Sequence, residues 1–404
     1  MYTIYIITMS FYVLPKNSFL IHKHIDFIET NSVPEPVVSN ALSVYLYEIK
    51  KKIEERDTQW DAYKKYTNPY EYIHTTVPYK KKSIAKYKPL SRSFFKMIEI
   101  MHTFQLAQST TPITTFHLAE GPGGFIEAIC MIRKNKKDRY IGMTLHDEIH
   151  DPTIPGWKKA ESFLKQNPNV HIETGNDNTG NILSVSNLVG CKESYGSSMD
   201  LITADGGFDF STDFNNQELS IAKLLFAQTC FALTMQKQGG TFILKIFDCF
   251  MQHTSDILCI LTSFYSKVFI TKPHTSRYAN SEKYIICKDF LLPSCERFFP
   301  FIIRAFTKMV SNNTNITNTP YVHRFLNCPI PLCFVSKIEE YNAIIGQQQL
   351  ENIHSTLLLI DNQYNQDKID SLINTNIQKC ILLCTKLGIQ HNNFTTSSTN
   401  VFLA

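Results

Sequence analysis

Lys245 occupies the position in this sequence that is hardest to explain without chemistry. It lies within the apolar run Thr241-Phe242-Ile243-Leu244-Lys245-Ile246-Phe247, which predicts a buried strand. A lysine in a central strand is costly unless its charge is paired or its pKa falls. A structural explanation for a lysine at this position is hard to supply, so we single out Lys245 as a candidate functional residue.

Three further charged residues stand near the ends of predicted elements. Asp205 follows the predicted strand Met199–Ala204, on the rim where ligands bind in open sheets. Glu282 stands at the mouth of the last predicted strand, and Lys96 lies in the helical segment Arg92–Met101. Taken singly, Lys96 reads as a solvated helix residue and Glu282 as a surface charge, so their roles stay open at this point.

A glycine-rich turn, Gly121-Pro122-Gly123-Gly124, joins the predicted strand Thr115–Ala119 to a predicted helix, Phe125–Ile132. Glycines let a ligand approach the backbone, and the helix N-terminus adds amide donors. A dinucleotide fold requires a small third residue where Ile126 stands, and Glu120 would repel a pyrophosphate. The sulfonium and ammonium of S-adenosylmethionine are favoured beside Glu120. We therefore predict this cofactor, with a purely structural turn as the alternative.

The elements that must position these residues alternate apolar runs with helical patterns from about residue 91 to 290. This alternation predicts an α/β fold with a mostly parallel sheet and helices on both faces. The predicted strands are 115–119, 139–144, 170–173, 199–204, 241–247, 267–271 and 283–288. The predicted helices are 125–132, 157–166, 217–236 and 256–265.

Composition indicates a globular protein. The 404 residues are 43% hydrophobic and 19% charged, with a net charge of +4, so nucleic-acid binding would have to come from local basic patches.

The 11 cysteines are scattered in apolar contexts, which favours a reducing compartment. Cys380 and Cys384 lack a partner pair, so we expect core residues and no metal. The Met1–Leu14 stretch lacks a basic leader, and we expect a buried strand there and no membrane span.

We divide the chain into an N-terminal extension (residues 1–90), the α/β region (91–290) and a mostly helical C-terminal region (291–404). The first region contains a helical stretch, 41–66, and a basic run from Lys80 to Lys88. The last shows apolar helical faces, for which we expect packing onto the rest of the chain rather than binding of a partner.

Six strings of this sequence follow the order of motifs in the FtsJ-like RNA 2′-O-methyltransferases and resemble them. They are Ser91-Arg92-Ser93-Phe94-Phe95-Lys96-Met97, Gly121-Pro122-Gly123-Gly124-Phe125, Gly142-Met143-Thr144-Leu145, Ala204-Asp205-Gly206-Gly207-Phe208, Gly239-Gly240-Thr241-Phe242-Ile243-Leu244-Lys245 and Ser276-Arg277-Tyr278-Ala279-Asn280-Ser281-Glu282. Asn68-Pro69-Tyr70-Glu71 is similar to a motif of the cap-specific, Adrift-type branch. Such proteins occur in large cytoplasmic DNA viruses, including African swine fever virus, and the Asn- and Lys-rich composition suits that origin.

The resemblance implies a Rossmann-like methyltransferase sheet with an antiparallel last strand, and methyl transfer from S-adenosylmethionine to a ribose 2′-hydroxyl near the 5′ cap of mRNA. It implies that Lys96, Asp205, Lys245 and Glu282 form a catalytic tetrad. Neutral Lys245 would accept the 2′-hydroxyl proton, because Lys96 and partial burial would lower its pKa. Asp205 would orient the Lys245 amine, and Glu282 would position Lys96 and the ribose.

The resemblance also implies a set of cofactor-binding residues: Glu120, Gly121, Pro122, Gly123, Gly124, Phe125, Thr144, Asp177 and Asp205. Asn181 matches the adenine-contacting position as well as Asp177 does. Asp147, after the second predicted strand, is a candidate for holding the ribose of the cofactor.

The candidate RNA-binding residues are Lys80, Lys81, Lys82, Arg92 and Arg277, with a second basic cluster at 133–139. A lysine run is usually a solvated face, so both interpretations of Lys80–Lys82 stay open. We expect capped RNA and other capping or transcription proteins as partners, in the cytoplasm or, for a viral chain, the host cytoplasm or virion. Two alternatives remain: a ribosomal or transfer RNA methyltransferase, and an inactive RNA-binding subunit.

Overall fold

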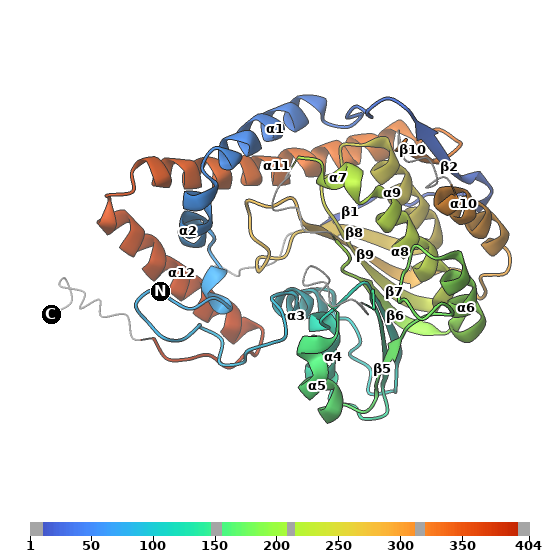
Figure 1. Cartoon of the computed structure of the whole chain (residues 1–404), viewed down its shortest axis with the longest axis horizontal. Coiled ribbons are helices and arrows are strands. Elements are labelled where there is room, and N and C mark those ends of the chain that lie inside the picture. The colour runs from blue at the N-terminus through green and yellow to red at the C-terminus, as the bar shows by residue number, and fades with distance from the viewer. Residues whose placement is uncertain (1–10, 147–155, 208–214, 312–319, 395–404) are drawn as a thin grey trace.

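The computed structural model describes residues 11–146, 156–207, 215–311 and 320–394, and an eight-stranded sheet lies at its centre (Figure 1). The strands of this sheet are β1 (Phe11–Val13), β3 (Thr114–Leu118), β4 (Arg139–Met143), β5 (Val170–Glu173), β6 (Met199–Ala204), β7 (Gln236–Ile246), β8 (Tyr265–Thr271) and β9 (Lys283–Phe290). Their order is β1-β8-β9-β7-β6-β3-β4-β5. Strands β3 to β7 pair in parallel, and β9 is antiparallel to both neighbours. The predicted mostly parallel sheet with an antiparallel last strand is confirmed.

Helices cover both faces of the sheet, as the alternation of elements predicts. One face carries α6 (Val185–Tyr195), α8 (Ala222–Met235), α9 (Gln252–Phe264) and α10 (Phe299–Ser311), which share one apolar core with the strands. The other face carries α3 (Ser93–Phe104), α4 (Gly124–Arg133) and α5 (Glu161–Gln166), which contribute to a second core. The sheet therefore separates two apolar layers.

Side-chain alternation along β7 decides which layer faces Lys245. Phe242 and Leu244 belong to the core on the α8 and α9 side, whereas Ile243 belongs to the core on the α3 and α4 side. Because successive strand residues point to opposite faces, Lys245 faces the same side as Ile243. Lys245 is thus directed toward the face covered by α3, the helix that carries Lys96.

Strands that follow β3 in the sequence lie on both sides of it in the sheet. After β3 it adds β4 and β5 on one side, then returns to place β6 and β7 on the other side of β3. In open α/β sheets ligands bind at the carboxyl ends of the strands at such a switch point. The Gly121–Gly124 turn follows β3 and the Asp205–Gly207 turn follows β6, so both lie at this point.

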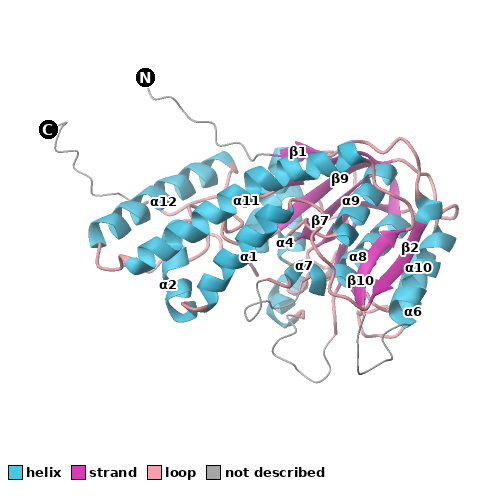
Figure 2. Cartoon of the chain, turned by 90° about the horizontal axis from the view of Figure 1, so that it is seen from above, coloured by secondary structure: helices cyan, strands magenta, loops and turns pink. Residues whose placement is uncertain are grey.

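The N-terminal and C-terminal extensions pack against each other (Figure 2). Their elements are η1 (His22–His24), β2 (Ile25–Thr30), α1 (Asn40–Glu54), α2 (Asp57–Thr67), η2 (Glu71–Ile73), β10 (Tyr321–Leu326), α11 (Leu332–Asp361) and α12 (Gln366–Lys386). Strands β2 and β10 form a separate two-stranded sheet. Ile53 and Trp60 of the first extension share a small core with Ile353, Leu357 and Ile360 of the second. The prediction that the C-terminal helices pack onto the chain is confirmed.

Several predicted elements differ from the observed ones. The helix predicted over 217–236 is divided into α7 (Gln217–Ser220) and α8, and β7 begins at Gln236 rather than at 241. The helix predicted over 157–166 is a 3₁₀ turn, η3 (Lys158–Ala160), followed by α5. The prediction of a buried first strand is wrong for its described part, because β1 is an edge strand with Phe11 and Val13 about half exposed. Residues 1–10 lie outside the described chain.

Strands β2 and β10 and helix α6 were not predicted. β2 and β10 are paired across almost 300 residues, a separation that local patterns do not report. α6 has Gly190 and several polar residues in its interior, although Ser184 caps its first turn by accepting a hydrogen bond from the Asn187 backbone. Cys380 and Cys384 are buried in the apolar core, as predicted. Within the part of the chain that the structure describes, none of the helices has both the length and the apolar character that crossing a bilayer requires.

Candidate active site

Two lysine–carboxylate pairs lie at the carboxyl edge of the sheet. Lys245 Nζ donates to the backbone oxygen of Asp205 at 2.6 Å and lies 3.3 Å from Asp205 Oδ1. Lys96 Nζ lies 2.7 Å and 2.8 Å from the two carboxylate oxygens of Glu282. The four side chains are between 10% and 13% exposed, so each pair is largely shielded yet reachable. The structure therefore brings together all four residues of the expected tetrad, from α3, β7 and the segments bordering β6 and β9.

Tyr284 connects the two pairs, and the sequence analysis missed it. It is the cross-strand neighbour of Lys245, so both side chains lie on the same face of the sheet. Its hydroxyl donates to Asp205 Oδ1 at 3.0 Å, and Lys96 Nζ lies 6.0 Å from its ring centroid. Burial, together with the charges of Asp205 and Glu282, raises the pKa of the Tyr284 phenol well above its usual range. Tyr284 is therefore a permanent hydrogen-bond donor at this site.

Glu282 is held as a carboxylate. Burial alone would raise its pKa, but the positive charges of Lys96 and then Lys245 outweigh burial and hold the pKa below its usual range. Ser276 Oγ also donates to Glu282 Oε1 at 2.8 Å. Both lysines thus act electrostatically on one carboxylate, which places the two ion pairs in a single charge cluster.

Lys272 fixes the backbone of the loop that carries Glu282. Its ammonium donates to the backbone oxygens of Asn280 at 2.6 Å and Glu282 at 2.9 Å. Burial, followed by the charge of Lys283, lowers the pKa of Lys272 to about 7. This lysine contacts the backbone rather than the tetrad carboxylates, and we regard it as a positioning residue for the loop.

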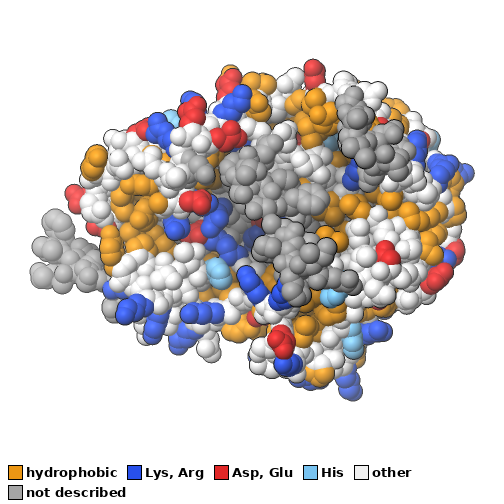
Figure 3. All heavy atoms as spheres, in the orientation of Figure 1, with side chains coloured by type: hydrophobic (Ala, Val, Ile, Leu, Met, Phe, Trp, Pro, Cys, Tyr) orange, Lys and Arg blue, Asp and Glu red, His pale blue; other side chains and the backbone are white. Residues whose placement is uncertain are grey.

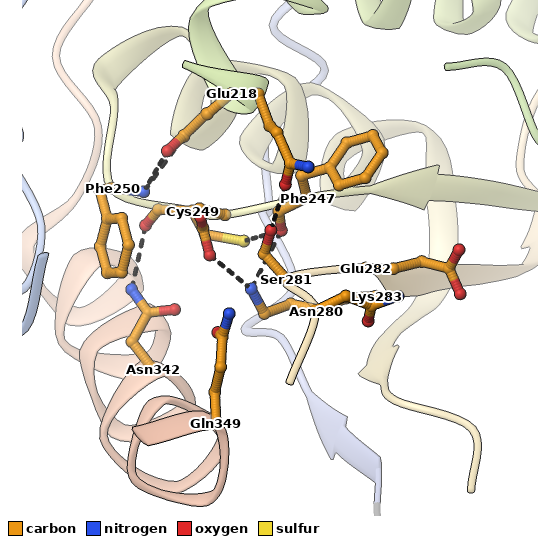
Figure 4. A network of polar contacts seen from close by, with 12 residues as sticks. Glu218, Phe247, Cys249, Phe250, Asn280, Ser281, Glu282, Lys283, Asn342 and Gln349 are labelled. Carbon is orange, nitrogen blue, oxygen red and sulfur yellow. Dashed lines mark hydrogen bonds and ion pairs between the residues drawn. The ribbon is translucent and has the colours of Figure 1, made fainter. Parts of the chain in front are cut away.

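A polar network links the loop between β8 and β9 to the C-terminal extension (Figure 4). Gln349 of α11 donates to the backbone oxygen of Ala279 at 3.0 Å, and Asn342 of the same helix donates to that of Cys249 at 3.0 Å. Ser281 Oγ donates to Gln217 Oε1 at 2.6 Å. Helix α11 therefore contacts both the loop before β9 and the loop after β7.

The glycine turn is compact because other parts of the chain approach it closely. Gly123 has a φ of 100°, a left-handed conformation that favours glycine. A Cβ on Gly124 would lie 2.2 Å and 2.3 Å from the hydroxyls of Ser91 and Ser93. A Cβ on Gly206 would lie 3.0 Å from that of Ala119, so the turns after β3 and β6 are in contact. The expected cofactor turn and the expected catalytic residues therefore share one location.

Glu120 is buried beneath this turn, and its surroundings fit a cationic ligand better than a phosphate. Its Oε1 accepts hydrogen bonds from the backbone N–H groups of Phe125 and Ile126. Its Oε2 is buried without a hydrogen-bond partner among the described residues. His117 Nδ1 lies 3.2 Å away but is engaged with Thr203, and burial lowers the pKa of His117 to about 3, so the ring is uncharged.

The pKa of Glu120 is raised well above its usual range by burial and, next, by Asp205. An ammonium or sulfonium arriving at the turn would favour the ionised carboxylate. A phosphate is negatively charged and would instead disfavour the ionised carboxylate of Glu120. The residues present therefore fit S-adenosylmethionine, the cofactor that the sequence analysis predicts.

The two candidates for the adenine contact, Asp177 and Asn181, both lie in the loop after β5. The Asp177 carboxylate accepts from the backbone and hydroxyl of Thr179, from Ser184 and from Asn187, all within its own loop. Burial would raise its pKa, but these hydrogen bonds outweigh burial and hold it well below the usual range. Asp177 therefore organises its own loop, while its side chain remains exposed. Asn181 Oδ1 accepts from Leu183 N at 2.9 Å.

The loop after β4 lies beside that loop. A Cβ on Gly180 would lie 1.9 Å from the backbone oxygen of Thr144, so the two loops are in close contact. The Thr144 side chain is mostly buried at the end of β4. Asp147 and Phe208, which the sequence analysis also considered, lie outside the described residues.

Glu71 holds the two candidate RNA-binding arginines. Its carboxylate is buried and accepts from Arg92 at 2.7 Å and from Arg277 at 2.9 Å and 3.0 Å. Burial would raise the pKa of Glu71, but the two guanidinium groups hold it well below its usual range. The arginine side chains remain 21% and 34% exposed. Glu71 is the last residue of the motif Asn68-Pro69-Tyr70-Glu71, but only the structure shows that it holds the two arginines.

Basic side chains gather near the site on one face of the molecule. In Figure 3, Lys and Arg side chains lie along the lower left rim, at the loop before α3, and in the central hollow. Lys80, Lys81 and Lys82 are exposed in that loop. This arrangement gives the expected local basic patch in a chain whose net charge is only +4.

Comparison with known proteins gives a consistent result. Residues 89–290 match the model of the family described as FtsJ-like methyltransferase. The cap-specific mRNA (nucleoside-2′-O-)-methyltransferase 2 of Danio rerio is 29% identical over 347 residues, covering 79% of this chain and 43% of the relative. Proteins named cap-specific mRNA (nucleoside-2′-O-)-methyltransferase 1 are 28% identical over 258 residues in Trypanosoma brucei brucei and 31% identical over 313 residues in Dictyostelium discoideum. These matches cover 62% and 71% of this chain. The chain spans between 39% and 66% of the length of these three relatives.

Proposed function

Because this chain belongs to the FtsJ-like methyltransferase family, we propose that it transfers a methyl group from S-adenosylmethionine to a ribose 2′-hydroxyl of RNA. The observation that carries the proposal is the meeting of Lys96, Asp205, Lys245 and Glu282 beside the glycine turn. Three relatives named as cap-specific mRNA methyltransferases support the cap-proximal nucleotide of mRNA as the target.

In this proposal Lys245 is the base. In its deprotonated form the Lys245 amine would accept the 2′-hydroxyl proton and so make the ribose oxygen nucleophilic, with no covalent enzyme intermediate needed. Asp205 orients the amine through its backbone oxygen and carboxylate. The Lys96–Glu282 pair positions the ribose beside it. S-adenosylmethionine would supply the methyl group on a positively charged sulfur, and the sulfur–methyl bond would break to leave the neutral thioether S-adenosylhomocysteine.

The residues proposed to hold the cofactor surround the switch point of the sheet. They are Glu120, Gly121, Pro122, Gly123, Gly124, Phe125, Thr144, Asp177 and Asp205. Asn181, in the same loop as Asp177, is the alternative residue for the adenine contact. We further propose that Arg92, Arg277 and Lys80–Lys82 bind RNA phosphates, with Glu71 holding the arginines in place.

Methyl transfer from labelled S-adenosylmethionine to capped and uncapped transcripts tests the proposal. We expect incorporation into capped RNA, located at a 2′-O-methylated nucleotide near the cap. Equal incorporation into uncapped ribosomal or transfer RNA would favour the first alternative function. RNA binding without any incorporation would favour the inactive subunit.

Lys245→Ala tests the proposed base. We expect kcat to fall by about 10²- to 10⁴-fold, the usual contribution of a general base, with cofactor affinity retained. Lys267→Ala, an exposed lysine on β8, is the matched control and should leave kcat unchanged. Near-normal methyl transfer by Lys245→Ala would show that the role assigned to Lys245 is wrong.

A further inference from the structure

Two adjoining hollows form a basic groove along α3 and α4. The first has a volume of about 780 Å³ and the second about 640 Å³, and both are lined by Gln108, Ile132 and Lys134. Because they share these residues, we treat them as one surface, which we call the α3–α4 groove. The two lysine-rich segments that the sequence shows separately, 80–88 and 133–139, meet here.

The ionisable side chains that line the groove are predominantly basic. Lys86 and His102 line the first hollow, Arg133 and Lys137 the second, and Lys134 both. None of the described residues lining either hollow is Asp or Glu. The lysines carry the accessible charge, because Arg133 is fully engaged by Asp138 and by the backbone oxygens of the loop at 107–111. A surface of this kind attracts an extended polyanion.

The floor of the groove is apolar and one wall is aromatic. Ile98, Met101, Met131 and Ile132 contribute the apolar surface. The Tyr87 ring is 43% exposed, and its hydroxyl donates to Glu127 Oε1 at 2.7 Å, which fixes the ring in place. Lysines beside a fixed aromatic ring are the combination that binds single-stranded nucleic acid by phosphate contacts and base stacking.

Hydrogen bonds within the protein hold both walls of the groove in place. Lys86 N donates to the backbone oxygen of Gln390 at 2.9 Å, and Ala85 forms a β-bridge with His391. On the opposite side, Arg133 holds the loop at 107–111 by three backbone hydrogen bonds. Because these walls are already ordered, binding loses less conformational entropy, and less affinity is lost.

One end of the groove lies near the glycine turn of the proposed active site. Leu90 lies within 4 Å of the position that a Cβ on Gly123 would occupy. Lys86 precedes Leu90 by four residues, a stretch of chain that spans at most about 14 Å. A strand of RNA that leaves the active site can therefore reach Lys86 and continue along α3 and α4.

We propose that the α3–α4 groove binds the RNA downstream of the methylated nucleotide. This inference rests on the proposed function and extends it from the target nucleotide to the body of the transcript. It predicts that longer transcripts bind more tightly than short ones, and that the groove lysines account for the difference.

The test compares a capped RNA of about 5 nucleotides with one of about 25 nucleotides that has the same 5′ sequence. The variant combines Lys86→Gln, Lys134→Gln and Lys137→Gln. The control variant makes the same change of charge at three exposed lysines elsewhere: Lys23→Gln, Lys52→Gln and Lys368→Gln. We expect the groove variant to raise KM for the longer RNA by about tenfold and to leave kcat/KM for the short RNA unchanged.

Binding of the longer RNA without cofactor gives a second readout that does not need methyl transfer. The slope of log affinity against log salt concentration should become shallower by about 2, because three phosphate contacts are lost. An unchanged slope, or an equal loss on the short and the longer RNA, would overturn the proposal. If the wild-type chain methylates neither RNA, the proposed function fails, while the binding measurement still decides the role of the groove.

Discussion

At the scale of single residues, the candidate active site is a cluster of two lysines, two carboxylates and one phenol. Each lysine has its own carboxylate, and Tyr284 donates to the carboxylate that faces Lys245. Asp205 Oδ1 therefore lies between a lysine amine and a tyrosine hydroxyl. Because both contacts are directional, the Asp205 carboxylate has one favoured orientation, and so does the amine beside it.

Tyr284→Phe tests this arrangement. Removing the hydroxyl leaves Asp205 Oδ1 with Lys245 as its neighbour, and a hydrogen bond to a charged group contributes about 1.5–3 kcal/mol. We expect the single-turnover rate of methyl transfer to fall about tenfold, with unchanged cofactor affinity. Tyr140→Phe removes a similar buried bond, from Tyr140 Oη to Asp138 Oδ2 at 2.8 Å, and should leave the rate unchanged. Equal rates for Tyr284→Phe and wild type would remove Tyr284 from the site.

At the scale of elements, the loop between β8 and β9 is held from several directions. Glu99 of α3 accepts from the backbone N–H groups of His274 at 2.9 Å and Thr275 at 3.1 Å. Lys272, at the end of β8, holds the backbone farther along the loop. Gln349 of α11 adds a bond from outside the family region. The position of Glu282 thus depends on elements before and after the sheet.

Gln349→Ala tests whether α11 positions this loop. Losing the bond to Ala279 should lower kcat by about threefold to tenfold, the range expected for a bond of about 0.5–1.5 kcal/mol, and leave the KM for cofactor unchanged. Gln347→Ala is the matched control, because Gln347 is exposed on the same helix and bonds to Glu351. A drop in melting temperature without a change in kcat would mean that the contact serves stability alone.

Asp248 joins three elements at the carboxyl end of β7. It pairs with Lys50 of α1 at 3.0 Å and with Lys283 of β9 at 3.3 Å. Burial would raise its pKa, but Lys50 and then Lys283 outweigh burial and lower the pKa to about 2. In an unfolded chain the pKa is about 3.9. The carboxylate therefore contributes its full stability above about pH 4, and this is lost as the pH falls toward 2.

Asp248→Asn should lower the free energy of unfolding at pH 7 by roughly 3 kcal/mol, because two lysines lose a buried partner. Denaturant unfolding between pH 7 and pH 2 measures this, and the difference between wild type and variant should shrink on acidification. Asp61→Asn, in an exposed pair with Lys64, should cost less than about 1 kcal/mol. A difference that stays constant with pH would contradict the assigned ion pairs.

At the scale of the whole molecule, the extensions complete the cores on both faces of the sheet. Phe298, Ile302 and Phe306, in and just before α10, are buried in the core on the α8 and α9 side. Ile373 and Leu383 of α12 are buried in the core on the α3 and α4 side. The cores on both faces of the sheet formed by residues 89–290, which match the family model, are therefore completed by residues outside that region.

A fragment limited to residues 89–290 should consequently fail to fold stably. Each large apolar side chain contributes roughly 1.5–3 kcal/mol by burial, so five of them together approach the usual net stability of about 5–15 kcal/mol. We expect no cooperative thermal transition and no cofactor binding, measured by calorimetry against the full chain. A fragment that melts cooperatively and binds cofactor normally would show that the extensions are dispensable for folding.

The sequence by itself determined the features that depend on neighbouring residues. The apolar run around Lys245 predicted that this residue lies in a buried strand, and the glycine turn and Asp205 followed from strand ends. The motif order implied which four residues would meet. These signals are local, because side-chain direction repeats along each element and turns require particular residue types.

Only the tertiary structure decided the partners that hold those residues in place. Glu71 contacts Arg277 across 206 positions, and Gln349 contacts the backbone of Ala279 across 70. The pairing of β2 with β10, and the meeting of two lysine-rich segments in the α3–α4 groove, likewise join distant parts of the chain. Such contacts arise because folding buries whole faces at once, and no local pattern records which distant segment will cover a given face.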